Sequence, residues 1–340
     1  MIDYHVSVTE KSIESYKVVR VGDFIISLRS FQGGIEYSSY DGICSPAYVI
    51  LRRRGEGSDE YFRHYLKTDR FIRVLTKNLE GLRDGKMISY KQFSELMLPV
   101  PKPAEQRKIA ECLSSVDDLI TAQARKVDAL KTHKKGLMQQ LFPREGETQP
   151  RLRFPEFQSA PAWDVKPLSK VAENLDNQRI PITSGNRKAG NTPYYGASGI
   201  VDYVEGFIFN EDLLCVSEDG ANLVARTYPI AFSISGKTWV NNHAHVLRFE
   251  NACTQKFVEV YLNSIKLNDF ITGIAQPKLN KAMLDRIPVP HPRVPEQEAI
   301  AGCLSSLDAL ITSETQKLEA LKTHKKGLMQ QLFPSLEEEK

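Results

Sequence analysis

The chain has 340 residues, of which 41% are hydrophobic and 26% are charged, a balance typical of a soluble globular protein with two domains. Its formal net charge of +3 permits an acidic partner such as nucleic acid but does not demand one. No apolar run approaches the roughly 20 residues that span a bilayer, and the first residues lack the layout of a secretion signal. We therefore expect a cytoplasmic protein that makes no contact with a membrane.

Residues 1–101 are predicted to form a first mixed α/β domain. Two short runs, DFIISLR and AYVILRR, have the β-branched and aromatic content of strands, and the amphipathic run DEYFRHYLKT follows them. The domain ends in the proline-rich exit LPVPKPAEQ, which marks the boundary before the next element.

Residues 102–143 are predicted to form one long helix. Its apolar positions recur in alternating steps of four and three residues for five heptads, with polar residues in this series only at Gln123 and Lys134. A 3.5-residue period is typical of a coiled-coil seam and is incompatible with a strand. Pro103 suits the first turn of a helix, and Pro143 ends it.

A polar linker, residues 144–152, leads to a second mixed α/β domain over residues 153–292. The strand-like runs DLLCVSE, IAFSIS and AHVLRF precede the helical run TQKFVEVYLNSI and a second proline-rich exit, IPVPHPRVPEQ. The elements thus follow the same order as in residues 1–101. The opening stretch from RFPEF onward has no counterpart before Met1, so we expect the first domain to be shortened at its N-terminus.

Residues 293–334 repeat the long helix, and residues 335–340 form an acidic tail. When Glu296 is aligned with Glu105, 28 of 39 positions are identical, and the segment ALKTHKKGLMQQLFP is unchanged. Cys112 and Cys303 occupy equivalent places in this repeat, and we expect both to be small buried core residues. The five cysteines include no C-x-x-C pair, so neither a disulfide framework nor a zinc site is expected.

Two such helices in one chain can bury each other's apolar stripes, and we predict an intramolecular antiparallel pair that acts as a rigid spacer. In the alternative arrangement, each helix packs on its own domain. The predicted fold class is α+β, with two β-rich mixed domains separated by two long antiparallel coiled-coil helices in a pseudo-two-fold repeat. The residues of the predicted seam are Ile109, Leu113, Val116, Ile120, Val127, Leu130, Leu137, Leu141, Ile300, Leu304, Leu307, Ile311, Leu318, Leu321, Leu328 and Leu332.

Three stretches are similar to enzymatic motifs, and each is incomplete. AFSISGKT has alanine where a phosphate loop needs glycine, and a strand-like run follows it in place of a helix. NTPYYG carries Thr192 where the Asn-Pro-Pro-Tyr motif of amino-methyltransferases has proline. His243 and His245 point to one face of a predicted strand, but no third metal ligand is spaced with them. We therefore predict no active site, no metal and no bound cofactor in this chain.

Three longer signals together make the chain similar to the specificity subunit of type I restriction–modification systems. They are RFPEF…W at the start of the second domain, GIAQPKLNKAMLDRIPVPHP…PEQEAIAGCLSSLD at its end, and LEALKTHKKGLMQQLFP at the end of the helix. The resemblance covers nearly the whole chain. It implies a non-catalytic subunit whose two target recognition domains each read one half of a split DNA sequence, while the paired helices fix the gap between the halves.

The same resemblance implies the partners, which are double-stranded DNA, two methyltransferase subunits docked on the helices, and restriction/translocase subunits that join through them. S-adenosylmethionine, ATP and Mg are expected on those partner subunits. Two copies of one partner would explain why one helix is repeated while the domains differ. The alternative function is a coiled-coil scaffold that holds protein partners and has degenerate recognition domains.

We expect contacts to phosphates to come from Lys and Arg, and contacts to base edges to come from Asn, Gln, Arg, Ser and Thr in loops that enter the major groove. Five polar stretches fit, namely LRSFQGG, GLRDGK, NQRIPITSGNRKAGNTPYYGASG, SGKTWVNN and GIAQPKLN. The residues predicted to contact DNA are Arg29, Ser30, Gln32, Arg83, Lys86, Arg179, Asn186, Arg187, Lys188, Tyr194, Tyr195, Ser198, Lys237, Thr238, Asn241, Asn242, Gln276 and Lys278.

Overall fold

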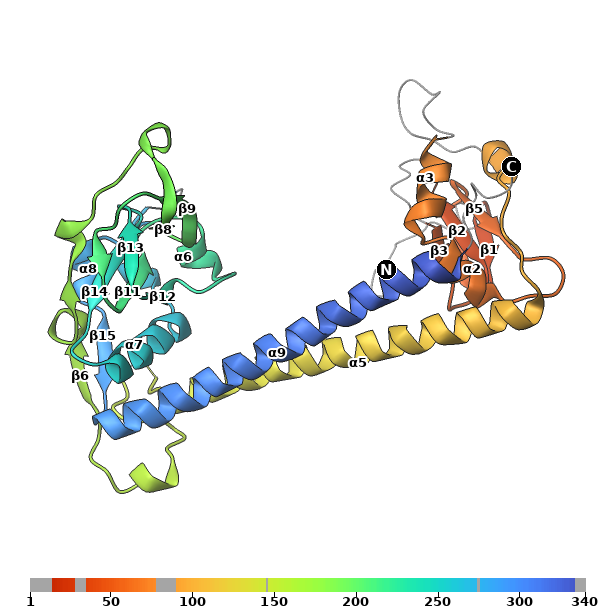
Figure 1. Ribbon diagram of the computed structural model, residues 1–340. Helices are drawn as coiled ribbons and strands as arrows, with labels where there is room; N and C mark the ends of the chain where they lie inside the picture. The colour runs from red at the N-terminus through yellow and green to blue at the C-terminus, as the bar shows by residue number, and fades with distance from the viewer. Residues whose placement is uncertain (1–13, 28–34, 78–89, 145, 274–275, 334–340) are drawn as a thin grey trace. The chain divides into compact units, whose positions relative to one another are not determined.

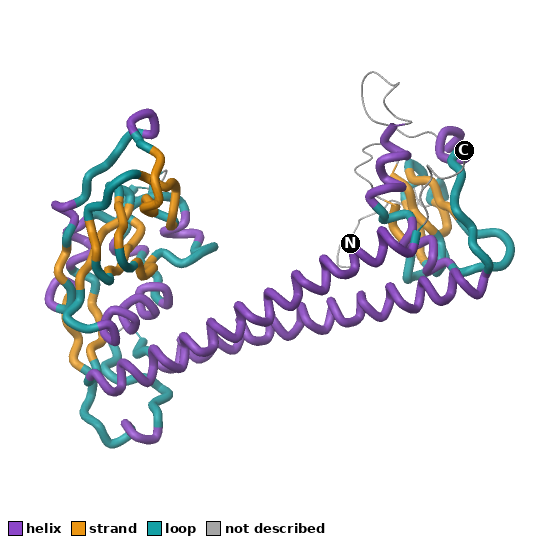
Figure 2. Tube along the Cα trace, in the orientation of Figure 1, coloured by secondary structure: helices purple, strands orange, loops and turns teal. Residues whose placement is uncertain are grey.

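The computed structural model describes residues 14–27, 35–77, 90–144, 146–273 and 276–333 (Figure 1). By its internal contacts the chain divides into two compact units, of which unit 1 is Met1–Lys126 with Glu314–Lys340 and unit 2 is Val127–Ser313. Each unit contains strands and short helices together with one stretch of each long helix (Figure 2). None of the described helices is both long and apolar enough to cross a bilayer.

The described residues of unit 1 form two small antiparallel sheets. Strand β1 (Lys17–Val19) pairs with β4 (Gly42–Cys44), and β2 (Phe24–Ser27) lies between β3 (Ile35–Tyr37) and β5 (Tyr48–Leu51). Three helices follow, α2 (Asp59–Tyr65), α3 (Asp69–Lys77) and α4 (Tyr90–Ser94). The predicted strands DFIISLR and AYVILRR are confirmed as β2 and β5, and the predicted helix DEYFRHYLKT is confirmed as α2.

Helix α2 begins where Ser58 accepts a hydrogen bond from the backbone N–H of Tyr61, which satisfies one of the free donors of the first turn. The rings of Tyr61 and Tyr65 are fully buried and lie 5.4 and 5.5 Å from the ring of Phe333. Because Phe333 directly follows the second long helix, the end of that helix forms part of the unit 1 core.

Where it is described, unit 2 has three sheets and three short helices. Strands β12 (Ala231–Ile234), β11 (Leu213–Ser217), β14 (Ala244–Arg248) and β7 (Glu173–Asn174) form one antiparallel sheet in that order. A second sheet has the order β10 (Phe209–Asn210), β13 (Lys237–Val240), β8 (Ala189–Gly196) and β9 (Gly199–Val204), with β13 and β8 parallel. Strand β6 (Asp164–Pro167) pairs with β15 (Pro288–His291). The helices are α6 (Asn222–Ala225), α7 (Ala252–Ser264) and α8 (Lys281–Asp285), with short 3-10 turns at Pro155–Phe157, Leu168–Lys170, Asp176–Gln178, Ser184–Asn186 and Asn268–Phe270.

The core of unit 2 forms around β11, all five residues of which are buried, and around the buried face of α7. Runs of consecutive buried apolar residues are typical of a strand that is covered on both faces. The predicted strands DLLCVSE, IAFSIS and AHVLRF and the helix TQKFVEVYLNSI are confirmed as β11, β12, β14 and α7.

The two predicted long helices are α5 (Pro103–Leu141) and α9 (Val294–Leu332), of 39 residues each. They pair in antiparallel fashion. In unit 1, Asp117 accepts a hydrogen bond from Lys325 at 2.6 Å, and in unit 2, Asp308 accepts one from Lys134 at 2.5 Å. These two pairs are equivalent in the repeat, and each places the same residue types opposite one another, which is the pattern of a two-fold interface. The predicted antiparallel pair is confirmed.

None of the sixteen predicted seam residues is exposed. Those at the ends of the helices also pack into the domain cores, so both packing arrangements considered above occur together. The buried seam residues are Ile109, Leu113, Val116, Val127, Leu141, Ile300, Leu304 and Leu318, and the rest are partly buried.

The expectation that Cys112 and Cys303 are buried is wrong. Cys112 is exposed and Cys303 is partly exposed. Each directly precedes a fully buried seam residue, Leu113 or Leu304, and one step along a helix turns a side chain by about 100° away from the buried stripe. The buried cysteine is Cys215 on β11, where burial raises the pKa of the thiol.

A polar contact interrupts the seam at Gln123 and its repeat equivalent, Glu314. The amide nitrogen of Gln123 donates to the Glu314 carboxylate at 2.7 Å, and Lys317 and Lys126 bind the other carboxylate oxygen at 2.9 and 3.1 Å. The hydrogen bond from Gln123 and the bonds from the two lysines lower the pKa of Glu314 to about 2.

We expect Glu314→Gln to reduce stability less in acid than at neutral pH. Glu314 is ionised in the folded chain down to about pH 2 but takes up a proton near pH 4.5 when the chain is unfolded. Its contribution to folding stability is therefore complete above pH 4.5 and is lost as the pH falls from 4.5 to about 2. Urea unfolding midpoints of wild type and variant at about pH 6 and about pH 3 test this. An equal difference in unfolding midpoint between wild type and variant at both pH values would contradict this expectation. Glu319→Gln, at an exposed position on the same helix, is the matched control.

Candidate nucleic-acid interface

Four of the predicted DNA-contacting residues of unit 2 lie at two edges of the sheet that contains the parallel strands β8 and β13. The amino edge, where these strands begin, carries Lys188 and Lys237, and the carboxyl edge, where they end, carries Ser198 and Asn242. All four side chains are exposed. The first-domain candidates, Arg29, Ser30, Gln32, Arg83 and Lys86, lie outside the described residues.

The amino edge presents cations from neighbouring segments. Lys188 directly precedes β8, and its carbonyl accepts a hydrogen bond from Glu205 at 2.9 Å. Lys237 opens β13 and lies 4.9 Å from the centre of the Phe207 ring. Arg187 is already engaged, because it binds Asp202 at 3.2 Å and stacks on the Tyr194 ring at 4.6 Å.

The carboxyl edge brings together amide and hydroxyl groups from three of the predicted stretches. The backbone N–H of Asn241 donates to the carbonyl of Tyr195, and the Asn241 side chain accepts a hydrogen bond from the N–H of His243. These contacts fix the turn that carries the exposed Asn242. The exposed Gln276 and Lys278 come from the third stretch, which is held by the bridge between Asp219 and Lys278.

Some of the predicted contact residues lie in the interior. The expectation that Tyr194 and Thr238 lie in exposed loops is wrong, because β8 and β13 pair there and bury them to 1% and 0% exposure. Asn241 is 6% exposed and serves the turn, and Tyr195 is partly buried against Phe232. The remaining exposed candidates are Asn186, Lys188, Ser198, Lys237, Asn242, Gln276 and Lys278.

Unit 2 also contains a charged network that the sequence indicated only in part. Arg179 donates to Glu218 at 2.7 Å and to the carbonyl of Ala244 at 2.8 Å, so it holds neighbouring segments together instead of presenting a free guanidinium. His245 lies 2.6 Å from Asp176 through Nδ1 and 2.7 Å from the Leu279 carbonyl through Nε2. The only partial signal in the sequence was the pair of histidines, His243 and His245.

Asp176, Glu218 and His245 place three potential metal-ligand atoms within 4.8 Å of one another. A carbonyl only accepts hydrogen bonds, so Nε2 of His245 carries a proton. Burial raises the pKa of Asp176, but the hydrogen bond and charge of His245, the hydrogen bond from the backbone N–H of Val246 and the charge of Arg179 together outweigh that effect, and the pKa lies below its ordinary value. Because Arg179 and Lys278 also bind these carboxylates, the cluster has the chemistry of a salt-bridge network instead of an open cation site.

The two motifs that are similar to enzymatic ones have structural roles. AFSISGKT forms β12, a turn in which Gly236 has φ of +66°, and β13, so no helix follows it to face a phosphate. NTPYYG lies within β8, where Tyr194 is buried and its hydroxyl bonds the backbone of Ile182.

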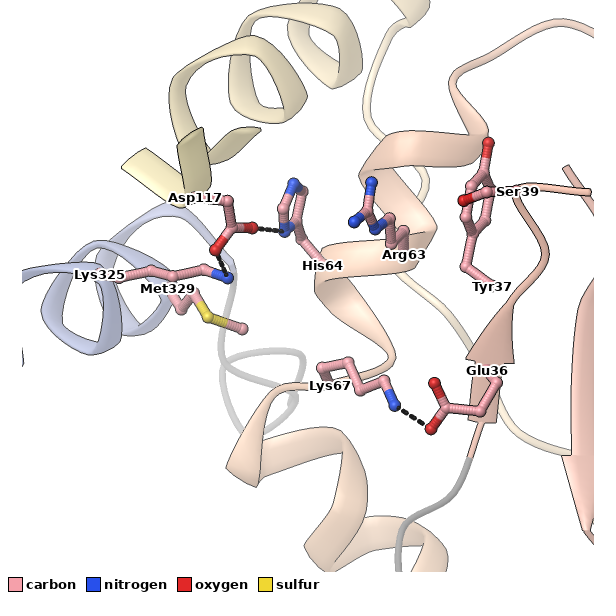
Figure 3. A pocket seen from close by; sticks show the side chains of 9 residues that line it. All are labelled: Glu36, Tyr37, Ser39, Arg63, His64, Lys67, Asp117, Lys325 and Met329. Carbon is pink, nitrogen blue, oxygen red and sulfur yellow. Dashed lines mark hydrogen bonds and ion pairs between the residues drawn. The ribbon is translucent and has the colours of Figure 1, made fainter. Parts of the chain in front are cut away.

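In unit 1, a pocket of about 250 Å³ lies where α2 meets both long helices (Figure 3). His64 on α2 lies 3.8 Å from Asp117 on α5, which in turn binds Lys325 on α9 at 2.6 Å. Burial lowers the pKa of His64, and the positive charge of Lys325 lowers it further, so the imidazole is neutral at pH 7. Lys67 and Glu36 form an ion pair of 2.7 Å across the pocket.

Comparison with known proteins agrees with this architecture. Residues 5–132 and 161–323 match the family model for the type I restriction modification DNA specificity domain. A putative type I restriction enzyme specificity subunit from Haemophilus influenzae is 40% identical over 149 residues, which are 44% of this chain and 38% of that protein. The type I restriction enzyme MjaVIII specificity subunit from Methanocaldococcus jannaschii is 26% identical over 362 residues, covering 96% of this chain and 81% of that one.

The fold is also similar to the crystal structure of the S subunit of a type I restriction–modification system from M. genitalium. The TM-score is 0.62 at 16% identity, over 94% of this chain and 85% of that chain. Fold and family match together define a DNA specificity protein of a restriction–modification system. The chain belongs to the family of type I restriction–modification specificity subunits, as its sequence predicted.

Proposed function

We propose that this specificity subunit is the non-catalytic DNA reader of its complex and that each recognition domain reads one half of a bipartite target. The observation that carries the proposal is the pairing of α5 with α9, in which repeat-equivalent residues make equivalent contacts. A two-fold frame built from one repeated sequence suits two identical partner subunits, whereas two domains of different sequence suit two different half-sites.

The length of the helices supports a role as a spacer. At 1.5 Å per residue, each 39-residue helix extends about 58 Å. Half-sites read from one side of B-DNA lie about 34 Å apart, one helical turn. The length of each helix exceeds this distance, which supports the proposed spacer role.

The partners proposed are double-stranded DNA and two methyltransferase subunits, with restriction/translocase subunits joined through these. S-adenosylmethionine, ATP and Mg would then be bound by the partners in the cytoplasm. This is in keeping with the structural roles of the phosphate-loop-like and methyltransferase-like stretches in the described part of unit 2.

Within unit 2, we assign phosphate contacts to Lys188 and Lys237, because Lys278 is paired with Glu218, and we assign base-edge contacts to Asn242 and Gln276. An ammonium group binds phosphate as a point charge, whereas an amide can form two hydrogen bonds with adenine. Arg179 then acts as a positioning residue, because its guanidinium binds Glu218, which follows β11, and the carbonyl of Ala244, which begins β14.

To test this function, the target is first found by sequencing methylated sites in cells with and without the gene. Binding of the complex to that duplex is then measured over a range of salt concentrations. We expect Lys188→Glu combined with Lys237→Glu to weaken binding and to reduce the salt slope by about 2, one for each lost phosphate contact. The control is Lys170→Glu combined with Lys266→Glu, at two exposed lysines outside both edges.

Equal affinity of the wild-type complex for a scrambled duplex would refute sequence reading. If the methyltransferase subunits still bound in that case, the alternative of a protein scaffold with degenerate recognition domains would hold instead.

A further inference from the structure

Two grooves of matching composition lie at the C-terminal ends of the long helices, one within each unit. The unit 2 groove, of about 990 Å³, lies between the end of α5, the end of α7 and the segment after α6. The unit 1 groove, of about 430 Å³, lies between the end of α9 and the start of α3. Six identical repeat positions line both, as Lys131, Lys134, Lys135, Met138, Gln139 and Phe142 in unit 2 and Lys322, Lys325, Lys326, Met329, Gln330 and Phe333 in unit 1.

The six pairs agree in burial as well as in identity. The first and third lysines and the glutamine are exposed in both units, the second lysine and the methionine are partly buried, and the phenylalanine is buried. The two recognition domains supply different residues to the opposite wall, Tyr228 and Asn263 in unit 2 and Thr68 and Arg73 in unit 1. What the two grooves share is therefore the helix surface, and a ligand common to both would bind mainly there.

Both grooves are strongly basic. The unit 2 groove is lined by the cations Lys131, Lys134, Lys135, Arg144 and Arg226 and by one carboxylate, Asp308. The unit 1 groove is lined by Lys67, Arg70, Arg73, Lys322, Lys325 and Lys326 and by one carboxylate, Asp69. A surface with this excess of one sign is complementary to a partner of the opposite sign.

Part of this charge is already used inside the protein. Lys134 binds Asp308, and Arg226 donates to the carbonyls of Leu262 and Ile265 at the end of α7. Lys131, Lys135 and Arg144 form no salt bridge with any described residue. These three cations of the unit 2 groove are free to bind a ligand.

In the unit 1 groove, the exposed lysines form ion pairs with exposed carboxylates, Lys326 with Asp69, Lys322 with Glu319 and Lys67 with Glu36. Such pairs are weak and can exchange for an external carboxylate at little cost. Lys67, Lys325 and Met329 also line the adjoining pocket of Figure 3, where Glu36 and Asp117 bind the two lysines, so the excess of positive charge is confined to the groove.

The grooves also have apolar surface. Met138 with Ile265 and Ile311 in unit 2, and Met329 in unit 1, are partly exposed beside the lysines. A thioether on a flexible chain suits an apolar side chain of a protein partner, whereas a DNA backbone offers phosphates and sugars alone. The identical sequence of the two sites also favours a repeated protein ligand over two different DNA half-sites.

We propose that each groove binds one copy of the same acidic protein segment, whose carboxylates meet the exposed lysines and whose apolar side chain meets the methionine. The proposal rests on the proposed function, since two identical methyltransferase subunits would supply the segment twice. The grooves thus give the docking contact a position on this chain and predict that the docked segment is negatively charged.

The experiment mixes the full chain with its methyltransferase subunit and counts bound copies by native mass spectrometry. We expect wild type to bind two copies. Lys131→Glu with Lys135→Glu should leave one copy, Lys322→Glu with Lys326→Glu should also leave one, and the fourfold variant should bind none. The affinity lost at each altered groove should be at least about tenfold. Circular dichroism melts confirm that the variants fold.

The matched control is Arg107→Glu with Lys108→Glu, a double reversal at exposed positions of α5 that line neither groove, and it should still bind two copies. Two copies on both the wild type and the fourfold variant would overturn the groove proposal and leave the proposed function standing. No copies on wild type would overturn both. Loss of DNA affinity with unchanged stoichiometry would identify the grooves as phosphate-backbone sites and would also overturn the proposal.

Discussion

Phe142→Ala is expected to destabilise unit 2, and Phe333→Ala is expected to destabilise unit 1, by about 3–5 kcal/mol each. Both side chains are buried at the same position of the repeat, just after the end of a long helix. The Phe142 ring lies 5.4 Å from the rings of Phe257 and Tyr261, so its removal leaves a cavity in the core and loses the ring contacts.

Hydrogen exchange measured peptide by peptide tests this expectation, because it reports the stability of each unit separately. Protection should fall mainly in β11 and α7 for the first variant and mainly in β2 and α2 for the second. Gln139→Ala and Gln330→Ala are the matched controls, since these equivalent residues are exposed and should change stability by less than about 0.5 kcal/mol. A uniform loss of protection over the whole chain in both variants would contradict the assignment of each phenylalanine to one core.

Arg153→Ala is expected to lower the free energy of unfolding of unit 2 by about 3–5 kcal/mol. The guanidinium binds both oxygens of Glu296 at 2.6 and 2.8 Å, and the side chains are 9% and 3% exposed. Arg153 also donates to the carbonyls of Ala160 and Pro161. Without the arginine, a buried carboxylate in the first turn of α9 would lose its partner.

Urea unfolding followed by the fluorescence of Trp163, which is buried in the same unit, measures the change. Trp239→Phe removes the other tryptophan and makes the signal specific. Glu105→Ala is the control, because Glu105 is the exposed repeat equivalent of Glu296 and forms no salt bridge with the described residues. A cost below about 1 kcal/mol for Arg153→Ala would show that the pair contributes little.

Family, fold class and the limits of the long helices could all be predicted from the sequence. The helices predicted over residues 102–143 and 293–334 are Pro103–Leu141 and Val294–Leu332. This succeeded because a 3.5-residue apolar period and terminal prolines are local signals, and because near identity of two segments requires them to have the same structure. The division of the chain into six segments by sequence remains a prediction, since contacts group it into two units that each include part of both helices.

The DNA-contacting residues could be predicted less completely than the long helices, because sequence indicates residue type but not exposure. Lys188, Lys237, Asn242 and Gln276 are exposed, whereas Tyr194 and Thr238 belong to the same polar stretches and are buried. The difference comes from the parallel pairing of β8 with β13, strands that are far apart in the chain. No local pattern reports such a pairing.

Two helices with one seam and two unlike domains follow from residue order alone, because periodicity and repetition are properties of neighbouring residues. The folded chain is needed to show that Phe142 and Phe333 enter domain cores, that Arg179 is held by Glu218, and that the repeated lysines line grooves. Those outcomes depend on which distant segments meet when apolar surface is buried, and many pairings satisfy the same local pattern.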